Sequence, residues 1–190
     1  MALISVQEII DLLIMVGAVG FIFKDVFQKP ITEGHDPLQF FKKNVSWENF
    51  KWAILVTAPA VVLHEAMHKI TAILFGIPAV FHASYTWLGI GILLKIMNFG
   101  FIFFVPGYVS YPGGLGSDGA RALIAFAGPA TNLVLFLLAT AALKYRFLPE
   151  KYTFALSLTK QINLFLFIFN MIPFPPFDGS HVLGNVFKMF

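Results

Sequence analysis

Residues 61–70 read VVLHEAMHKI and place His64, Glu65 and His68 inside an apolar stretch that extends over residues 52–75. An ionisable side chain in such a stretch costs about 2.5–3.5 kcal/mol on membrane-insertion scales, and it marks a functional site by default. The stretch is also longer than the roughly 20 apolar residues that a helix needs to cross a bilayer. The segment therefore predicts a transmembrane helix that carries chemistry.

The composition of the 190-residue chain is typical of a membrane protein. Hydrophobic residues make up 58% of it and charged residues only 12%, whereas about 25% charged residues is usual in soluble proteins. A soluble domain would need more polar side chains to cover its surface. The formal net charge of +3 favours contact with the headgroups of a lipid bilayer, and we expect no nucleic-acid partner. The absence of cysteine excludes disulfides, cysteine zinc sites and thiol catalysis.

Four apolar stretches are long enough to cross a bilayer as helices. They are residues 6–27, 52–75, 120–143 and 152–172. The first lacks a small-residue cleavage site, so we expect a retained span and not a signal peptide. The chain contains no linker, which predicts a single membrane-embedded domain over residues 1–190 and an all-α polytopic fold. Ser117 or Asp118 can serve as N-cap of the third helix.

A fifth hydrophobic segment, GIGILLKIMNFGFIFF (89–104), is short for a span and is interrupted by Lys95. Segments of this length are more often re-entrant or interfacial. The flanking residues 79–87 and 103–111 are rich in β-branched and aromatic side chains, which favour strands, and Pro106 would confine its strand to an edge. We expect a small membrane-associated β-hairpin with a re-entrant segment between its strands. The alternative is a fifth span.

Two histidines at positions i and i+4 project from one face of a helix. The imidazoles of His64 and His68 can therefore bind one metal ion, with zinc–nitrogen distances of about 2.0–2.1 Å. Glu65 is placed to accept a proton from a water on that metal without being a ligand itself. This is the H-E-x-x-H arrangement of zinc peptidases. The alternative is a buried, hydrogen-bonded cluster of these side chains that holds helices together.

A catalytic zinc usually has three protein ligands and one open position, so a third ligand must come from another segment. Asp178 is the best candidate, since it ends the fourth apolar stretch in NMIPFPPFDGSH (170–181), where three prolines interrupt the helix and Gly179 allows a turn. Irregular backbone at membrane depth is tolerated where it is buried in protein or lines a cavity. The second candidate is His181. Other possible ligands after His68 are less well placed, and they are His82, Asp118 and Glu150.

Three motifs follow one another on the last three apolar stretches: HEAMH (64–68), FAGPATN (126–132) and NMIPFPPFDG (170–179). In this order they resemble the motifs of the site-2 protease family of intramembrane zinc metalloproteases. The resemblance covers roughly residues 52–185, and residues 1–51 add an N-terminal span and a loop. That family also has a membrane-embedded β-hairpin after its first motif, in agreement with the strands expected above.

The resemblance assigns roles to individual residues. It implies one zinc ion per chain, held by His64, His68 and Asp178, with Glu65 as the catalytic base. It further implies that Asn170 and Asn132 face the active-site cleft and bind the substrate. For both asparagines the alternative is hydrogen bonding between helices inside the bundle.

The implied reaction is hydrolysis of peptide bonds within or near transmembrane segments of membrane-protein substrates, by a multi-pass protein of the cell membrane. The target helix must unwind first, because its carbonyl groups are already hydrogen-bonded. An exposed strand edge in residues 79–87 or 103–111 would stabilise the unwound segment by β-addition, and Asn170 could hold its backbone groups.

Two other functions are compatible with parts of this pattern. A zinc transporter or sensor without catalytic activity would use the two histidines but would not need Glu65. A second family of membrane zinc peptidases takes its third ligand from a later Glu, but no Glu occurs between Glu65 and Glu150. For orientation, the resemblance places the active site near the cytosolic face, whereas the lysines at the span ends favour the reverse under the positive-inside rule.

Overall fold

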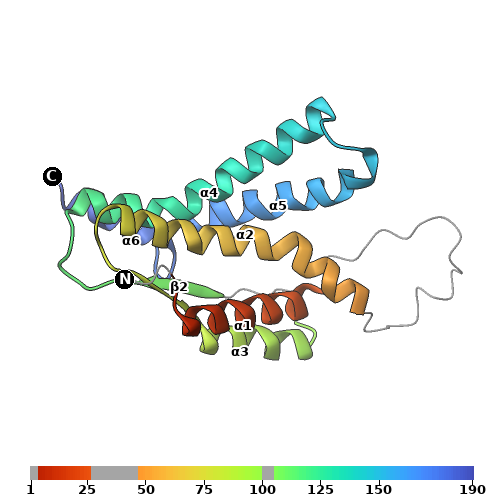
Figure 1. Cartoon of the computed structure of the whole chain (residues 1–190), viewed down its shortest axis with the longest axis horizontal. Helices are drawn as coiled ribbons and strands as arrows, with labels where there is room; N and C mark the ends of the chain where they lie inside the picture. Colours follow the sequence, from red (N-terminus) through yellow and green to blue (C-terminus); the bar gives the residue numbers. More distant parts are fainter. Residues whose placement is uncertain (1–3, 27–46, 100–104) are drawn as a thin grey trace, which may run out of the picture.

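The computed structural model describes residues 4–26, 47–99 and 105–190. Of the described residues 72% are helical, in six helices, and a small two-stranded antiparallel sheet accompanies them. Figure 1 shows how these elements are arranged. The all-α polytopic fold predicted from the sequence is confirmed. In chain order the elements are α1 (Val6–Phe23), α2 (Trp47–Leu74), β1 (Val80–Ala83), α3 (Tyr85–Ile96), β2 (Gly107–Ser110), α4 (Asp118–Tyr145), a 3-10 turn (Glu150–Tyr152), α5 (Thr153–Asn170) and α6 (Asp178–Phe187).

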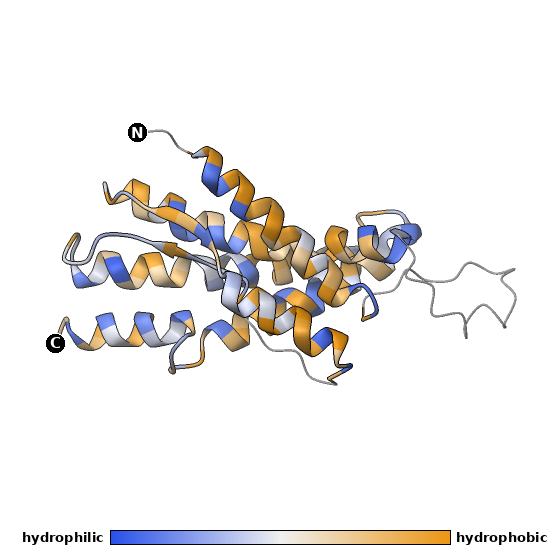
Figure 2. Cartoon of the chain, turned by 90° about the horizontal axis from the view of Figure 1, so that it is seen from below, coloured by the Kyte–Doolittle hydropathy of each residue, from blue (hydrophilic) through white to orange (hydrophobic). Residues whose placement is uncertain are grey.

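Four of these helices are long and apolar enough to cross a membrane, namely α1, α2, α4, and α5 together with the 3-10 turn before it. They coincide with the four predicted stretches to within a few residues. Large apolar side chains on three of them point outward, with Leu13 67%, Leu55 62% and Leu138 61% exposed. Figure 2 shows hydrophobic residues along much of the length of the helices. Such a surface is stable in lipid, and it gives the chain the character of a membrane protein.

Local capping determines where two of the spans begin. The N-cap of α4 is Ser117, whose hydroxyl accepts a hydrogen bond from the N–H of Ala120 at 3.2 Å. The sequence left the choice between Ser117 and Asp118 open. The N-cap of α1 is Ser5, which forms a reciprocal capping box with Glu8, and this box satisfies two backbone donors that the first turn of a helix leaves unpaired.

The helix α4 packs against α2, α5 and α6, while α1 packs against α2. In Figure 1 the pair α1 and α3 therefore lies on the other side of α2 from α4 and α5. The contact between α1 and α2 is close at Gly20, where an added Cβ would lie 2.4 Å from Cγ1 of Ile54. Small residues allow such close approach of helices in a membrane.

The strands β1 and β2 are antiparallel, with Ala83 opposite Gly107. Both lie within the predicted segments, but residues 84–87 are not strand, and that part of the prediction was wrong. The N–H of Ser84 donates to the carbonyl of Pro106 at 3.0 Å. Since proline has no N–H to return a bond, the ladder stops there, and the chain turns into α3.

The helix α3 separates the two strands, so the sheet is not closed by a tight turn. Its 12 residues span about 18 Å at 1.5 Å per residue, which is well short of a hydrocarbon core of about 30 Å. The structure thus favours the re-entrant interpretation over a fifth span for residues 89–96. The end of the predicted segment, residues 100–104, lies outside the described residues.

Candidate metal centre

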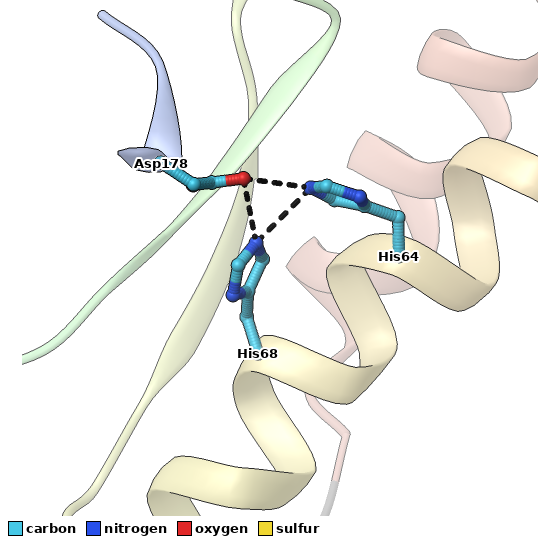
Figure 3. A group of neighbouring side chains, drawn as sticks. All are labelled: His64, His68 and Asp178. Carbon is cyan, nitrogen blue, oxygen red and sulfur yellow. Dashed lines mark hydrogen bonds and ion pairs between the residues drawn. The ribbon is translucent and has the colours of Figure 1, made fainter. Parts of the chain in front are cut away.

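The helix α2 places His64 and His68 one turn apart, so that both rings point to the same side. Their Nε2 atoms lie 3.1 Å apart. Asp178, the first residue of α6, brings its Oδ2 to 3.1 Å from Nε2 of His64 and 3.3 Å from Nε2 of His68, as Figure 3 shows. The structure therefore brings together the three ligands predicted from the sequence, and all three are shielded from solvent to a large degree.

The outer nitrogen of each imidazole is held by a hydrogen bond. Nδ1 of His64 donates to Oδ1 of Asn132 at 2.6 Å, and Nδ1 of His68 donates to the backbone carbonyl of Ile124 at 2.7 Å. Carbonyl oxygens only accept hydrogen bonds, so each ring carries its proton on Nδ1. In its neutral form each ring therefore presents the Nε2 lone pair to the centre, which is the arrangement that second-shell partners impose on metal-binding histidines.

The orientation of the Asn132 amide is fixed by a chain of hydrogen bonds that ends in backbone carbonyls. The side-chain NH₂ of Asn163 donates to the carbonyl of Thr159 at 2.8 Å. Its Oδ1 therefore accepts from Nδ2 of Asn132 at 2.9 Å, and the same Nδ2 also donates to the carbonyl of Ala60 at 3.2 Å. Oδ1 of Asn132 must then face His64. The backbone carbonyl of Thr159 on α5 thus helps to keep the proton of His64, on α2, at Nδ1.

The donor set fits a zinc ion. Two imidazole lone pairs and an ionised carboxylate are all acceptors, and when both rings are neutral no proton lies between them. Three acceptor atoms at 3.1–3.3 Å repel one another unless a cation lies between them. A tetrahedral zinc with bonds of about 2.0–2.1 Å keeps its ligands about 3.3 Å apart. Two His and one Asp also leave the fourth position of zinc open.

Glu65 lies beside the cluster without joining it. Its side chain is 8% exposed and lines the same cavity as the ligands. Oε2 of Glu65 is buried and has no hydrogen-bond partner among the described residues. Buried polar atoms nearly always have a partner, which can be water. An unpaired carboxylate oxygen at this place is therefore suited to a water molecule or a substrate in the cavity.

The metal centre opens into a cavity of about 830 Å³ that is walled by α1, α2, β2, α4, α5 and α6. Asn170 and His181 both line it, and His181 lies outside the three-residue cluster.

Asn132, by contrast, is fully buried and has no surface in the cavity. It bonds to His64 and Ala60 on α2 and to Asn163 on α5, so its position matches the helix-bonding alternative more closely than contact with a substrate. Burial raises the pKa of the Tyr111 hydroxyl in the cavity wall further above neutral pH, so this group is a hydrogen-bond donor there.

Two glycines allow the backbone to approach the site closely. A Cβ on Gly128 would lie 2.3 Å from Nε2 of His68 and 2.6 Å from Nε2 of His64. A Cβ on Gly179 would lie 2.4 Å from the carbonyl oxygen of Met171. The role expected for Gly179 as a turn residue was wrong, because it lies inside α6 and has no positive φ. Its small size is needed where α6 meets the end of α5.

Sequence reasoning missed Asn163 and Gly128. The available signal for Asn163 was an amide inside an apolar span, seven residues before Asn170 and so on the same helix face. Gly128 stood inside the quoted motif FAGPATN, but no pattern in the sequence indicates that its backbone would lie against the two histidines.

The close approach of Gly128 leads to a prediction. Gly128→Ala places a methyl group where the metal ion would bind. We expect zinc affinity to fall by more than the roughly 10–100-fold that follows loss of a second-shell partner, as measured by competition with a chelating dye. The matched control is Gly184→Ala on α6, where an added Cβ meets nothing within 4 Å. Equal zinc affinity in both variants would contradict the geometry described here.

Comparisons with known proteins agree with a metalloprotease. No protein-family model matches the chain, and no solved structure matches it. A protein of Methanocaldococcus jannaschii named "putative zinc metalloprotease" is 34% identical over 180 residues, which cover 94% of this chain and 84% of that protein. A Synechocystis protein with the same description is 32% identical over 134 residues, covering 70% of this chain but only 30% of that protein. The chain belongs to the zinc metalloprotease family that these relatives represent.

Proposed function

We propose that the chain is an intramembrane protease of the site-2 protease family, a multi-pass protein of the cell membrane. It hydrolyses peptide bonds within or near the transmembrane segments of membrane-protein substrates. The observation that carries the proposal is the convergence of three ligand atoms and the unpaired Oε2 of Glu65 on one cavity, inside helices that are long enough to span a membrane.

The position of the cluster along α2 supports cleavage at membrane depth. His64 lies ten residues before Leu74, where the helix ends, and ten residues correspond to about 15 Å of helix. The hydrocarbon core of a bilayer is about 30 Å thick. The motif order also supports the site-2 assignment, since FAGPATN contributes Gly128 to the metal centre and NMIPFPPFDG contributes Asp178.

The protein's own groups can perform the proton transfers that hydrolysis needs. His64, His68 and Asp178 would hold the zinc, which supplies Lewis-acid activation of water and of the scissile carbonyl when it is bound. Glu65 would take one proton from the attacking water as a new C–O bond forms. It would return that proton to the amide nitrogen as the C–N bond breaks, so that a carboxylic acid and an amine leave.

The sheet offers an edge for an unwound substrate. The N–H groups of Phe81 and Ala83 donate to carboxylates of α1, so these residues point their backbone away from β2. Their partners Val109 and Gly107 therefore point their backbone away from β1, as non-hydrogen-bonded pairs of an antiparallel ladder do. The whole of β2 lines the cavity. This supports β-addition at β2 over β1.

A zinc carrier would need the imidazoles but would have no use for the buried, unpaired oxygen of Glu65, so the hydrolase is the better account. The test is incubation of purified protein, reconstituted in lipid vesicles, with a panel of single-span membrane peptides. We expect cleavage that a zinc chelator abolishes and that added zinc restores. Cleavage that persists after complete removal of the metal would contradict the proposal.

A further inference from the structure

Two carboxylates on α1 take no part in the chemistry described so far. Glu8 is 6% exposed and Asp11 is 2% exposed, although both lie on a helix that is apolar enough to span a membrane. Neither lines the cavity or belongs to the metal cluster. Buried acidic groups in a span are costly and are kept for a function. We call Glu8 and Asp11 the α1 carboxylate pair.

Both members of the α1 carboxylate pair bind the outer edge of β1. Oε1 of Glu8 accepts the N–H of Phe81 at 2.9 Å, and Oδ2 of Asp11 accepts the N–H of Ala83 at 3.1 Å. Asp11 also accepts the hydroxyl of Tyr85 at 2.6 Å. The two acids are three residues apart and share a helix face, while Phe81 and Ala83 are two apart and expose their N–H groups on one strand edge.

This arrangement replaces a third strand with a helix. A neighbouring strand would both accept and donate hydrogen bonds, and it would leave a new open edge on its far side. Ionised carboxylates only accept, so they satisfy the N–H groups of β1 and end the sheet there. Covering an edge with a helix is a recognised way to prevent further strands from pairing. Among the described residues, the sheet is left with one free edge, on β2.

Glu8 also ties the sheet to the helix that carries the metal ligands. Its Oε1 forms an ion pair with Lys69, the residue that follows His68 on α2. One carboxylate thus joins α1, β1 and α2 at a single point. The distance from the free edge of β2 to the metal centre is consequently set by this contact as well as by packing.

We propose that the α1 carboxylate pair positions the substrate, by closing β1 and holding β2 beside the metal so that an extended apolar segment can pair only with β2. The inference rests on the function proposed above. Glu8 and Asp11 are positioning residues and not catalytic residues, since they touch neither the metal ligands nor the cavity. Their loss should weaken substrate binding and leave zinc binding intact.

The kinetic test uses three single variants of the full-length protein. Asp11→Ala removes the acceptor for Ala83, and we expect KM for a cleaved single-span peptide to rise about tenfold or more, with zinc affinity and kcat nearly unchanged. Asp11→Asn keeps an acceptor oxygen and should restore most of the affinity. The control is Asp25→Asn, which alters a carboxylate that pairs with Lys95 and should have no effect on KM.

A cross-linking test is informative even if the Asp11→Ala protein is unstable, because its first comparison leaves α1 unchanged. The chain has no cysteine, so single cysteines can be placed at Tyr108→Cys on β2 or Val80→Cys on β1, both at exposed positions. Each single-cysteine variant also carries Glu65→Gln, which prevents cleavage. It is then mixed with a single-span peptide that contains one cysteine. We expect disulfide capture at Tyr108→Cys and not at Val80→Cys, and capture at Val80→Cys once Asp11→Ala is added.

The outcomes separate the two claims. Equal capture at both positions with native α1, or an Asp11→Ala variant with unchanged KM and unchanged capture, would overturn the positioning role and leave the proposed protease intact. A native chain that neither cleaves the peptide nor captures it at Tyr108→Cys would overturn the proposed function, and the positioning role with it.

Discussion

Replacing Glu65 with Gln is expected to lower the rate of peptide hydrolysis by about 10²–10⁴-fold, the usual loss when a general base is removed, while zinc stays bound. The amide has nearly the same size as the carboxylate, but it cannot accept a proton from water. Glu65 is not one of the three clustered ligands, so the metal site should be preserved. The variant should also retain uncleaved substrate.

The measurement compares single-turnover cleavage and zinc content of Glu65→Gln with those of the native chain. The control is Asp118→Asn, the same chemical change at a carboxylate that pairs with Arg121 at the start of α4 and does not line the cavity. This control should cleave at the native rate. Cleavage by Glu65→Gln at a rate near that of the control would show that Glu65 is not the base.

Replacing Asp178 with Ala is expected to remove both zinc and activity. Oδ2 of Asp178 is the only oxygen in the cluster of ligand atoms, and without it two imidazoles remain to hold the ion. The loss of affinity should exceed the roughly 10–100-fold effect of removing a second-shell partner. Metal analysis after gel filtration measures the loss, and cleavage should fall in parallel with zinc content.

The informative comparison is His181→Ala, because sequence reasoning left His181 as the second candidate for the third ligand. His181 lines the cavity but lies outside the cluster, so this variant should keep its zinc. The opposite pattern, with zinc retained in Asp178→Ala and lost in His181→Ala, would transfer the third-ligand role to His181.

Features that depend on local sequence were predictable. The four spans follow from hydropathy, because a chain in lipid must satisfy its backbone groups within helices. The pairing of His64 with His68 follows from helix geometry. Asp178 could be chosen because the chain has few carboxylates and histidines after His68, and because the prolines before it interrupt α5 at the end of a span.

Features that depend on contacts between distant segments could not be predicted. The closeness of Gly128 to both imidazoles, and the hydrogen bond from Asn132 to Asn163, depend on the rotation and axial position of α4 relative to its neighbours. In the sequence, Glu8 and Asp11 are polar interruptions of an apolar stretch, and the position of β1 beside α1 gives both of them backbone partners. Hydropathy detects the cost of such residues but does not identify their partners.

The central claim is that this chain cleaves polypeptides at membrane depth with the metal centre of His64, His68 and Asp178. The most direct measurement is mass-spectrometric mapping of the bond that the purified protein cuts in a single-span peptide embedded in lipid vesicles. We predict a cut within the apolar span or in the few residues next to it, which appears only with zinc and is absent for Glu65→Gln. A cut confined to the soluble ends of the peptide, or an intact peptide in the presence of zinc-loaded protein, would contradict the account.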